Sequence, residues 1–242
     1  MKLVIIRHGD PDYSIDSLTP TGWKEAELLA DRVCKWDVKA FYVSPLGRAR
    51  DTAKATLERM GREATVMDWL REFPPHIKRE GYDIGDCCWD WLPKDWTVTE
   101  QFYDRKAWLK VPVYAESKTP AEYKKVCEGL DALLESHGYK REGDYYRAVT
   151  ANTDTVVLFC HFGLECVLLS HLLNVSPMVL WHGFCASPTS VTILNTEERR
   201  EGIAYFRACC MGDTSHLYVA GATPSFSGRF CETYDNFDQR HD

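Results

Sequence analysis

The feature that most constrains the fold is a short apolar run, Leu3-Val4-Ile5-Ile6, that ends directly in Arg7-His8-Gly9. Apolar and β-branched residues in an unbroken run predict a strand that is buried on both faces of a sheet. Strands of this kind belong to α/β folds, in which helices cover both faces. Because open α/β sheets bind ligands just beyond the carboxyl ends of their strands, His8 lies at a candidate site.

The same pattern recurs at two later strands. Residues 40–43 predict a buried strand that is followed by Ser44-Pro45 and, shortly afterwards, by Arg48. Residues 155–160 predict another, which runs straight into His161-Phe162-Gly163. The ends of such strands can converge on one crevice, so we expect two arginines and two histidines to meet there.

Helical periodicity separates these strands. Apolar spacing predicts helices at about 20–36, 49–60, 119–136 and 164–172, with Thr19 as N-cap and Thr119-Pro120-Ala121-Glu122 as a capping box. Two late strands, 190–194 and 203–208, are expected to be joined by a charged turn, 195–202. We therefore predict a three-layer α/β/α sandwich with a mostly parallel mixed sheet.

The segment from about residue 73 to 118 breaks this pattern. Its periodicity is weak, and it contains four of the eight tryptophans of the chain. We predict an inserted, aromatic-rich cap within a single domain that spans residues 1–242. The tryptophans could form the core of that cap, line a substrate pocket or make a partner interface, and we favour a cap whose inner face touches substrate.

Composition excludes several classes of partner. The chain has 242 residues, 45% of them hydrophobic, and a net charge of -7, which argues against broad binding of nucleic acid or anionic membranes. Its ten cysteines are scattered without a C-x-x-C spacing, which indicates reduced thiols and no metal site. No signal peptide or membrane-length apolar segment is recognisable, so we expect a cytoplasmic protein.

Arginines and histidines that converge in one cleft need an anion, because unpaired buried cations are costly. A phosphoryl group would satisfy them, since arginine donates bidentate hydrogen bonds to its oxygens and a helix start after His161 adds N–H groups. A neutral imidazole can attack phosphorus, and the leaving alkoxide then needs a proton from a nearby carboxylic acid.

Several motifs carry a resemblance to a known family. They are Arg7-His8-Gly9, Leu18-Thr19-Pro20-x-Gly22, Ser44-Pro45-x-x-Arg48-Ala49-x-x-Thr52-Ala53, Leu70-Arg71-Glu72-Phe73, the strand into His161, and Asp213-Thr214-Ser215-His216-Leu217. In this order they resemble the histidine phosphatase superfamily, in its phosphoglycerate-mutase-like branch. The resemblance implies the fold of that branch, a small phosphorylated substrate, and a reaction without metal or other cofactor.

The resemblance also implies roles for individual residues. His8 would be the phosphorylated nucleophile, Arg7, Arg48 and His161 would clamp the phosphoryl group, and Glu72 would be the general acid. Phe162 stands where the family often has glycine, and its backbone N–H can still face the phosphate. Ser14, in the first loop, is a further candidate phosphate ligand.

Two questions stay open in the sequence. The Gly-Asp-Trp-Glu-Gly-like sequence usual after the acid is absent, so Glu80, Asp86 and Asp90 remain alternatives to Glu72. The activity could be that of a histidine acid-type phosphatase, of a phosphoglycerate-type mutase, or of a non-catalytic module that binds phosphorylated ligands. The loop Asp10-Pro11-Asp12-Tyr13-Ser14 differs from the Ser-x-Trp-Asn of the mutases and favours hydrolysis. A homodimer is possible.

Overall fold

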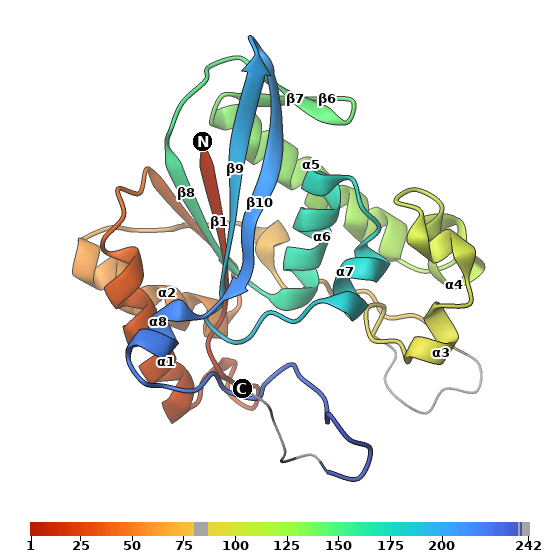
Figure 1. Cartoon of the computed structure of the whole chain (residues 1–242), viewed down its shortest axis with the longest axis horizontal. Helices are drawn as coiled ribbons and strands as arrows, with labels where there is room; N and C mark the ends of the chain where they lie inside the picture. Colours follow the sequence, from red (N-terminus) through yellow and green to blue (C-terminus); the bar gives the residue numbers. More distant parts are fainter. Residues whose placement is uncertain (80–86, 237, 239–242) are drawn as a thin grey trace.

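The computed structural model describes residues 1–79, 87–236 and 238. Within these residues one mixed sheet has the strand order β5-β4-β8-β1-β9-β10-β7-β6, and a small ribbon pairs β2 (Pro11–Asp12) with β3 (Ser17–Leu18). Helices cover both faces of the large sheet (Figure 1). The predicted three-layer α/β/α arrangement is confirmed.

The parallel part of the sheet carries the motifs. It contains β1 (Lys2–Arg7), β8 (Thr155–Cys160), β4 (Ala40–Val43) and β5 (Thr65–Val66). Arg7 pairs with Cys160, and Val43 pairs with Phe159. The last residues of three neighbouring strands therefore lie level with one another, as expected from the sequence.

The other half of the sheet is antiparallel and consists of β9 (Val191–Arg200), β10 (Ile203–Asp213), β7 (Tyr145–Ala148) and β6 (Tyr139–Glu142). The expected turn at 195–202 is wrong, because both strands continue through this charged stretch and form a long hairpin that projects from the sheet (Figure 1). Glu197 and Arg207 pair across it at 2.7 Å, so the charges stabilise a solvent-exposed ribbon.

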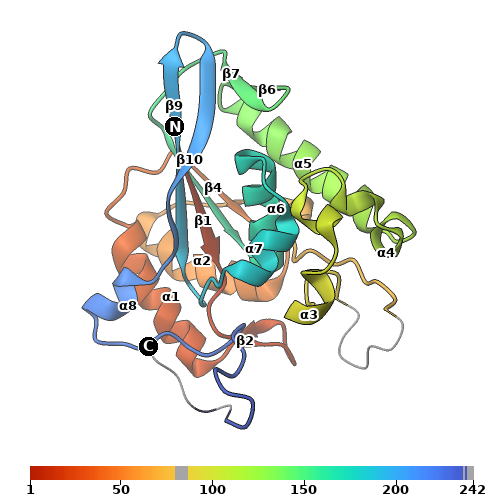
Figure 2. The ribbon, with the colours of Figure 1, turned by 45° about the vertical axis from the view of Figure 1, so that its right-hand side comes forward.

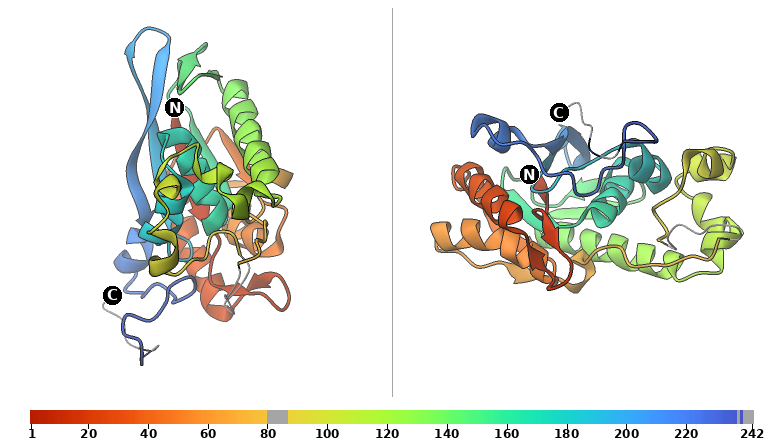
Figure 3. Two further views of the ribbon diagram at one scale, coloured as in Figure 1. Left: turned by 90° about the vertical axis from the view of Figure 1, so that its right-hand side faces the viewer. Right: turned by 90° about the horizontal axis from the view of Figure 1, so that it is seen from below.

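Two sets of helices complete the sandwich (Figure 3). The face toward α1 (Pro20–Val33) and α2 (Gly47–Met60) buries Val4 and Ile6, whereas the face toward α5 (Thr119–Ser136) and α6 (Phe162–Leu173) buries Leu3 and Ile5. Two shorter helices, α7 (Pro177–Gly183) and α8 (Ser215–Val219), pack against α6 and α1 respectively. Alternate residues of β1 thus enter opposite cores, as the pleat requires.

The helix starts test the predicted caps. Thr19 caps α1 as expected, since its hydroxyl accepts a hydrogen bond from Gly22 N at 3.0 Å. The capping box at Thr119 is wrong: Thr119 is already helical, and its own N–H donates to the Ser117 hydroxyl at 3.0 Å. The N-cap residue is Lys118, whose side chain makes no capping hydrogen bond, and the Ser117 hydroxyl accepts the N–H that the predicted box would have used.

The aromatic segment is irregular, with short helices α3 (Pro93–Trp96) and α4 (Pro112–Ala115) and 3-10 turns at Glu100–Tyr103 and Trp108–Lys110; another such turn, Asp68–Leu70, precedes it. It lies beyond α6 and α7, on the side away from α1 (Figure 2). Trp108 is fully buried and makes edge contacts with Tyr114, Tyr123 and Trp181 at 5.1–5.6 Å between ring centroids. The segment therefore shares its aromatic core with the main domain. That it forms a substrate-contacting cap stays a prediction.

No helix among the described residues is both long and apolar enough to cross a lipid bilayer.

Replacing Trp108 with alanine tests whether the aromatic segment is part of the main core. We expect the free energy of unfolding to fall by about 3–5 kcal/mol, since the variant loses a fully buried indole that packs between the aromatic segment and the main domain. Denaturant unfolding measures this change. Val98→Ala, in the same segment but 77% exposed, should stay within about 0.5 kcal/mol. Equal small effects of the two substitutions would show that the segment is not integrated with the core.

Candidate active site

His8 lies just beyond β1 and is almost completely buried. Its Nδ1 is 2.7 Å from the carbonyl oxygen of Gly9. A carbonyl can only accept, so Nδ1 carries the proton and donates it. In the neutral ring, Nε2 then holds the free lone pair. This contact fixes both the tautomer and the orientation of the ring.

His161 directly follows β8, and its ring lies 5.1 Å from that of His8, centroid to centroid. Its Nε2 is 2.7 Å from the hydroxyl of Ser44, which lies beyond the end of β4 and accepts a hydrogen bond from Leu46 N at 3.2 Å. Within the described residues, Nδ1 of His161 has no hydrogen-bond partner although it is buried. Ser44 therefore holds this ring by one nitrogen and leaves the other available.

Both imidazoles are held in the neutral form. Burial lowers the pKa of His8 well below its usual value, and the positive charges of Arg7 and Arg48 lower it further, against the opposing effect of the Gly9 carbonyl. Burial likewise lowers the pKa of His161, with His8 and the two arginines adding to the effect. A neutral ring keeps the lone pair that nucleophilic attack requires.

Arg48 stands in the first turn of α2 and donates from Nη1 to Asp16 Oδ1 at 2.6 Å. Asp16 also accepts from Gly47 N at 2.7 Å, so one carboxylate orients the arginine and the start of its helix. Further along α2, the Thr52 hydroxyl accepts from Gly9 N at 2.8 Å and donates to Arg48 O at 2.7 Å. The helix is thus tied directly to the backbone beside His8.

Arg7 reaches a segment that is more than two hundred residues away in the chain. Its Nη1 donates to the carbonyl oxygens of Ala186 at 2.6 Å and Ser227 at 3.1 Å. Gly228 has a φ of +85°, and a Cβ there would lie 2.7 Å from Arg7 Nη1. The C-terminal tail therefore forms a wall against this guanidinium, and only glycine fits at the point of contact.

A second contact anchors the same tail. The buried carboxylate of Glu25, on α1, accepts from Ser225 N at 3.1 Å and from Asp10 N at 2.8 Å. One side chain therefore joins the tail to the loop that follows His8. The tail runs below the carboxyl ends of the parallel strands, where these contacts lie (Figure 1).

Glu72 is brought to the start of α6. Its Oε1 accepts from Phe73 N at 2.8 Å and from Leu164 N at 3.0 Å. A Cβ on Gly163 would lie 2.8 Å from Glu72 Oε1, so glycine is needed for the helix to approach this closely. Burial raises the pKa of Glu72, and the backbone N–H groups and the charges of Arg7 and Arg48 oppose the rise.

The remaining candidate residues are Ser14, Phe162, Asp90, Glu80 and Asp86. Ser14 is exposed and donates its hydroxyl to Asp12 at 2.5 Å, so no described contact joins it to His8. Phe162 opens α6 with its ring against Trp89. Asp90 influences the pKa of His182 and Cys87 rather than that of either site histidine. Glu80 and Asp86 lie outside the described residues.

The sequence interpretation did not assign roles to Asp16, Ser44 and Thr52, or to the tail. Ser44 and Thr52 belong to the motif that runs from Ser44 to Ala53, and their hydroxyl groups are the sequence feature that indicates a hydrogen-bonding role. Asp16 and the tail offered no local signal, since their contacts exist only in the folded chain. The structure gathers Arg7, His8, Arg48, His161 and Glu72 at one end of the sheet.

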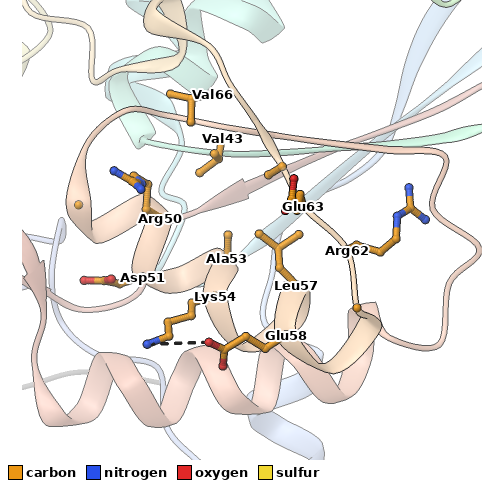
Figure 4. A pocket seen from close by; sticks show the side chains of 13 residues that line it. Val43, Arg50, Asp51, Ala53, Lys54, Leu57, Glu58, Arg62, Glu63 and Val66 are labelled. Carbon is orange, nitrogen blue, oxygen red and sulfur yellow. Dashed lines mark ion pairs between the residues drawn. The ribbon is translucent and has the colours of Figure 1, made fainter.

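A surface pocket of about 680 Å³ lies apart from the two histidines, between α2 and the edge strand β5 (Figure 4). Lys54 and Glu58 pair at 3.9 Å on its wall. Its lining contains neither histidine and neither of the two site arginines. It is therefore not the candidate active site. In the part of the chain that the structure describes, no three His, Cys, Asp or Glu side chains form a metal-binding group.

Comparison with known proteins gives a family and a relative. The model of the histidine phosphatase superfamily (branch 1) matches residues 3–208. Putative phosphoserine phosphatase 2 of Hydrogenobacter thermophilus is 35% identical over 80 residues, which cover 29% of this chain and 39% of that relative. The match thus spans well under two thirds of the relative's length.

Solved structures share the fold. A phosphoserine phosphatase mutant from Entamoeba histolytica, in complex with phosphoserine, covers 89% of this chain and 98% of its own with a TM-score of 0.58 and 20% identity. Mycobacterial glucosyl-3-phosphoglycerate phosphatase, in complex with inorganic phosphate, gives the same coverages with a TM-score of 0.60 and 21% identity. At such identities the likeness concerns the fold alone.

Gly228→Ala tests the contact between the tail and Arg7. We expect the added methyl to displace the tail, so that amide exchange of residues 225–228 becomes about tenfold faster, equivalent to losing about 1.4 kcal/mol of local stability. Hydrogen exchange followed by mass spectrometry measures this rate.

Gly221→Ala is the matched control, because Gly221 also has a positive φ, +67°, but has open space around its Cβ position. Exchange at 225–228 should stay slow in that variant. Unchanged exchange in Gly228→Ala would mean that the tail does not rest on Arg7 in solution.

Proposed function

The chain belongs to branch 1 of the histidine phosphatase superfamily, and we propose that it hydrolyses phosphate monoesters through a phosphohistidine on His8. One observation carries the proposal: His8 is neutral, buried and locked by its Nδ1–H on the Gly9 carbonyl, with Nε2 free beside Arg7, Arg48 and His161. An acceptor nitrogen surrounded by cationic and neutral donors suits attack on a phosphoryl group.

In the first step Nε2 of His8 attacks phosphorus, a P–N bond forms and the bond to the leaving oxygen breaks. Arg7, Arg48 and His161 stabilise the negative charge on the phosphoryl oxygens. The Glu72 carboxyl donates its proton to the leaving oxygen, and the raised pKa of this group keeps it protonated to a higher pH than an ordinary glutamate.

In the second step the Glu72 carboxylate accepts a proton from water, and the water oxygen attacks phosphorus. The P–N bond breaks, its electron pair returns to Nε2, and inorganic phosphate leaves. Glu72 ends the cycle protonated and His8 neutral, so the step balances without metal or redox chemistry.

We propose a small phosphorylated metabolite as substrate. The relatives named above act on phosphoserine and glucosyl-3-phosphoglycerate, which makes such monoesters the first compounds to assay. The assignment as a histidine acid-type phosphatase and a cytoplasmic location are finer expectations from the sequence and stay predictions. Incubation with 3-phosphoglycerate separates hydrolysis from mutase activity: we expect phosphate release, and isomerisation without release would contradict the proposal.

His8→Ala tests the covalent step. Rapid-quench labelling with an aryl phosphate should give an acid-labile phosphoenzyme in the unaltered protein and none in the variant. Turnover should fall by at least about a thousandfold, because the nucleophile is lost. Equal turnover by the two proteins would falsify His8 as nucleophile. His171→Ala is the control, because His171 lies in the last turn of α6 and pairs with Asp131 of α5. This variant should retain labelling.

Glu72→Gln tests the general acid. With an alkyl phosphate the rate should fall by about 10²–10⁴, and with a nitrophenyl phosphate much less, because a good leaving group needs no proton. Since the pKa of Glu72 is raised, turnover of the alkyl ester by the unaltered protein should decline as pH rises through that pKa. Asp90→Asn is the control for the alternative acid. Unchanged alkyl phosphatase activity in Glu72→Gln would move the role elsewhere.

A further inference from the structure

Glu165 is a buried carboxyl group to which the proposed reaction assigns no role. It stands in the first turn of α6, where its N–H donates to His161 O at 2.9 Å, and its side chain is completely buried. Within the described residues neither carboxylate oxygen has a hydrogen-bond partner of regular geometry. A buried carboxylate without partners is destabilising, so an apolar residue would serve this core better.

The sheet register shows which groups face Glu165. Leu3 and Ile5 of β1 point into the core that contains α6, and Arg7 follows in the same alternation. Thr192 of β9 is paired with Ile5, so its side chain emerges on that face too. Arg7 also has an orphaned buried atom, Nε. The register therefore places Arg7 and Thr192 on the sheet face that α6 covers, and Glu165 stands in the first turn of that helix.

The electrostatic surroundings agree with this placement. The pKa of Glu165 is raised to about 7, mainly by burial. The Thr192 hydroxyl and the charge of Arg7 act to lower this pKa, and the charge of Glu72 acts to raise it. Glu165 in turn raises the pKa values of the buried Cys160 and Cys166 thiols, which burial already places well above their usual range. Arg7 is thus the cation, and Glu72 the other carboxyl, that act on Glu165.

We propose that Glu165 is a positioning residue that acts through Arg7, serving as its built-in counter-ion when the site is empty and taking up a proton when a phosphate-like dianion binds. The inference rests on the proposed function in one respect, that Arg7 is an anion ligand. In the empty site the guanidinium stabilises the ionised carboxylate. A bound dianion neutralises Arg7 and repels the carboxylate, which then binds one proton from solvent and becomes a neutral carboxyl.

Linkage makes the effect reciprocal. If the dianion favours protonation of Glu165, then deprotonation of Glu165 at higher pH must weaken binding of the dianion by the same factor. Each pKa unit by which the anion raises the carboxyl corresponds to about a tenfold change in affinity. In the empty site the Glu165 carboxylate keeps Arg7 in its orientation. When the dianion binds, protonation of Glu165 removes the second negative charge that would otherwise compete for Arg7.

The test is binding of inorganic sulfate between pH 6 and pH 8.5, where sulfate remains a dianion. Glu72 would also repel the anion as it ionises, so the measurements use Glu72→Gln as background. The dissociation constant should rise by about tenfold with pH in this background, and Glu72→Gln/Glu165→Gln should lose that rise. Calorimetry in two buffers of different ionisation enthalpy should detect proton uptake near pH 7 in the first protein only.

Glu25→Gln in the same background is the matched control. Glu25 is also buried with a raised pKa, but its oxygens accept from Asp10 and Ser225, and the pH dependence should survive its replacement. Glu165→Met repeats the test with an apolar residue of similar length in case glutamine disturbs the fold, and thermal unfolding checks both variants.

The outcomes separate the two claims. Equal pH dependence with and without Glu165 overturns this inference and leaves the phosphatase proposal intact. No sulfate binding by the Glu72→Gln protein, and none by the unaltered protein, overturns the anion site itself. Stability gives an independent readout: the folded pKa of Glu165 exceeds that of an exposed glutamate, so Glu165→Met should raise the melting temperature at pH 8 and not at pH 4.5. An equal effect at both pH values also overturns the inference.

Discussion

The hydrogen bond from His8 Nδ1–H to the carbonyl of Gly9 is the contact on which the proposed chemistry depends. It decides which nitrogen is free, and the burial of the ring keeps that nitrogen unprotonated. Thr52 holds the N–H of the same glycine, and the N–H of His8 donates to the carbonyl oxygen of Cys160 at 3.0 Å. A change that released Gly9 would therefore disturb the nucleophile without touching its side chain.

Sheet register does the rest of the positioning. Because β1, β8 and β4 end level with one another, the side chains that follow them, His8, His161 and Ser44, meet without long loops. The arginines are then oriented by partners outside the sheet: Asp16 for Arg48, and carbonyl oxygens near residues 186 and 227 for Arg7. The strands fix where the groups stand, and remote segments fix how they point.

The sequence predicted the parts that depend on local patterns. Buried strands, their polar ends and the first helix cap are encoded within a few residues, and the structure agrees with them. The capping box at Thr119 failed because another hydroxyl, two residues away, competes for the same N–H. The turn at 195–202 failed because a densely charged segment suits an exposed ribbon as well as a loop.

Long-range contacts were beyond the reach of such patterns. Nothing near Gly228 indicates that it touches Arg7, and nothing near Glu165 indicates that it faces the same arginine. On α6, which is buried nearly all round, apolar periodicity cannot separate a core position from a position behind a site. Such roles follow only from the register and packing of the folded chain.

The central claim concerns the state of one imidazole, and nitrogen NMR of the His8 ring measures it directly. Long-range proton–nitrogen correlation spectra, assigned with a His8→Ala variant, distinguish the two neutral tautomers and the cation. The structure predicts a neutral ring with its proton on Nδ1 at neutral pH, because burial and the two arginines lower the pKa of His8 well below its usual value. A ring protonated on Nε2, or one that titrates near the ordinary histidine value of about 6.5, would contradict it.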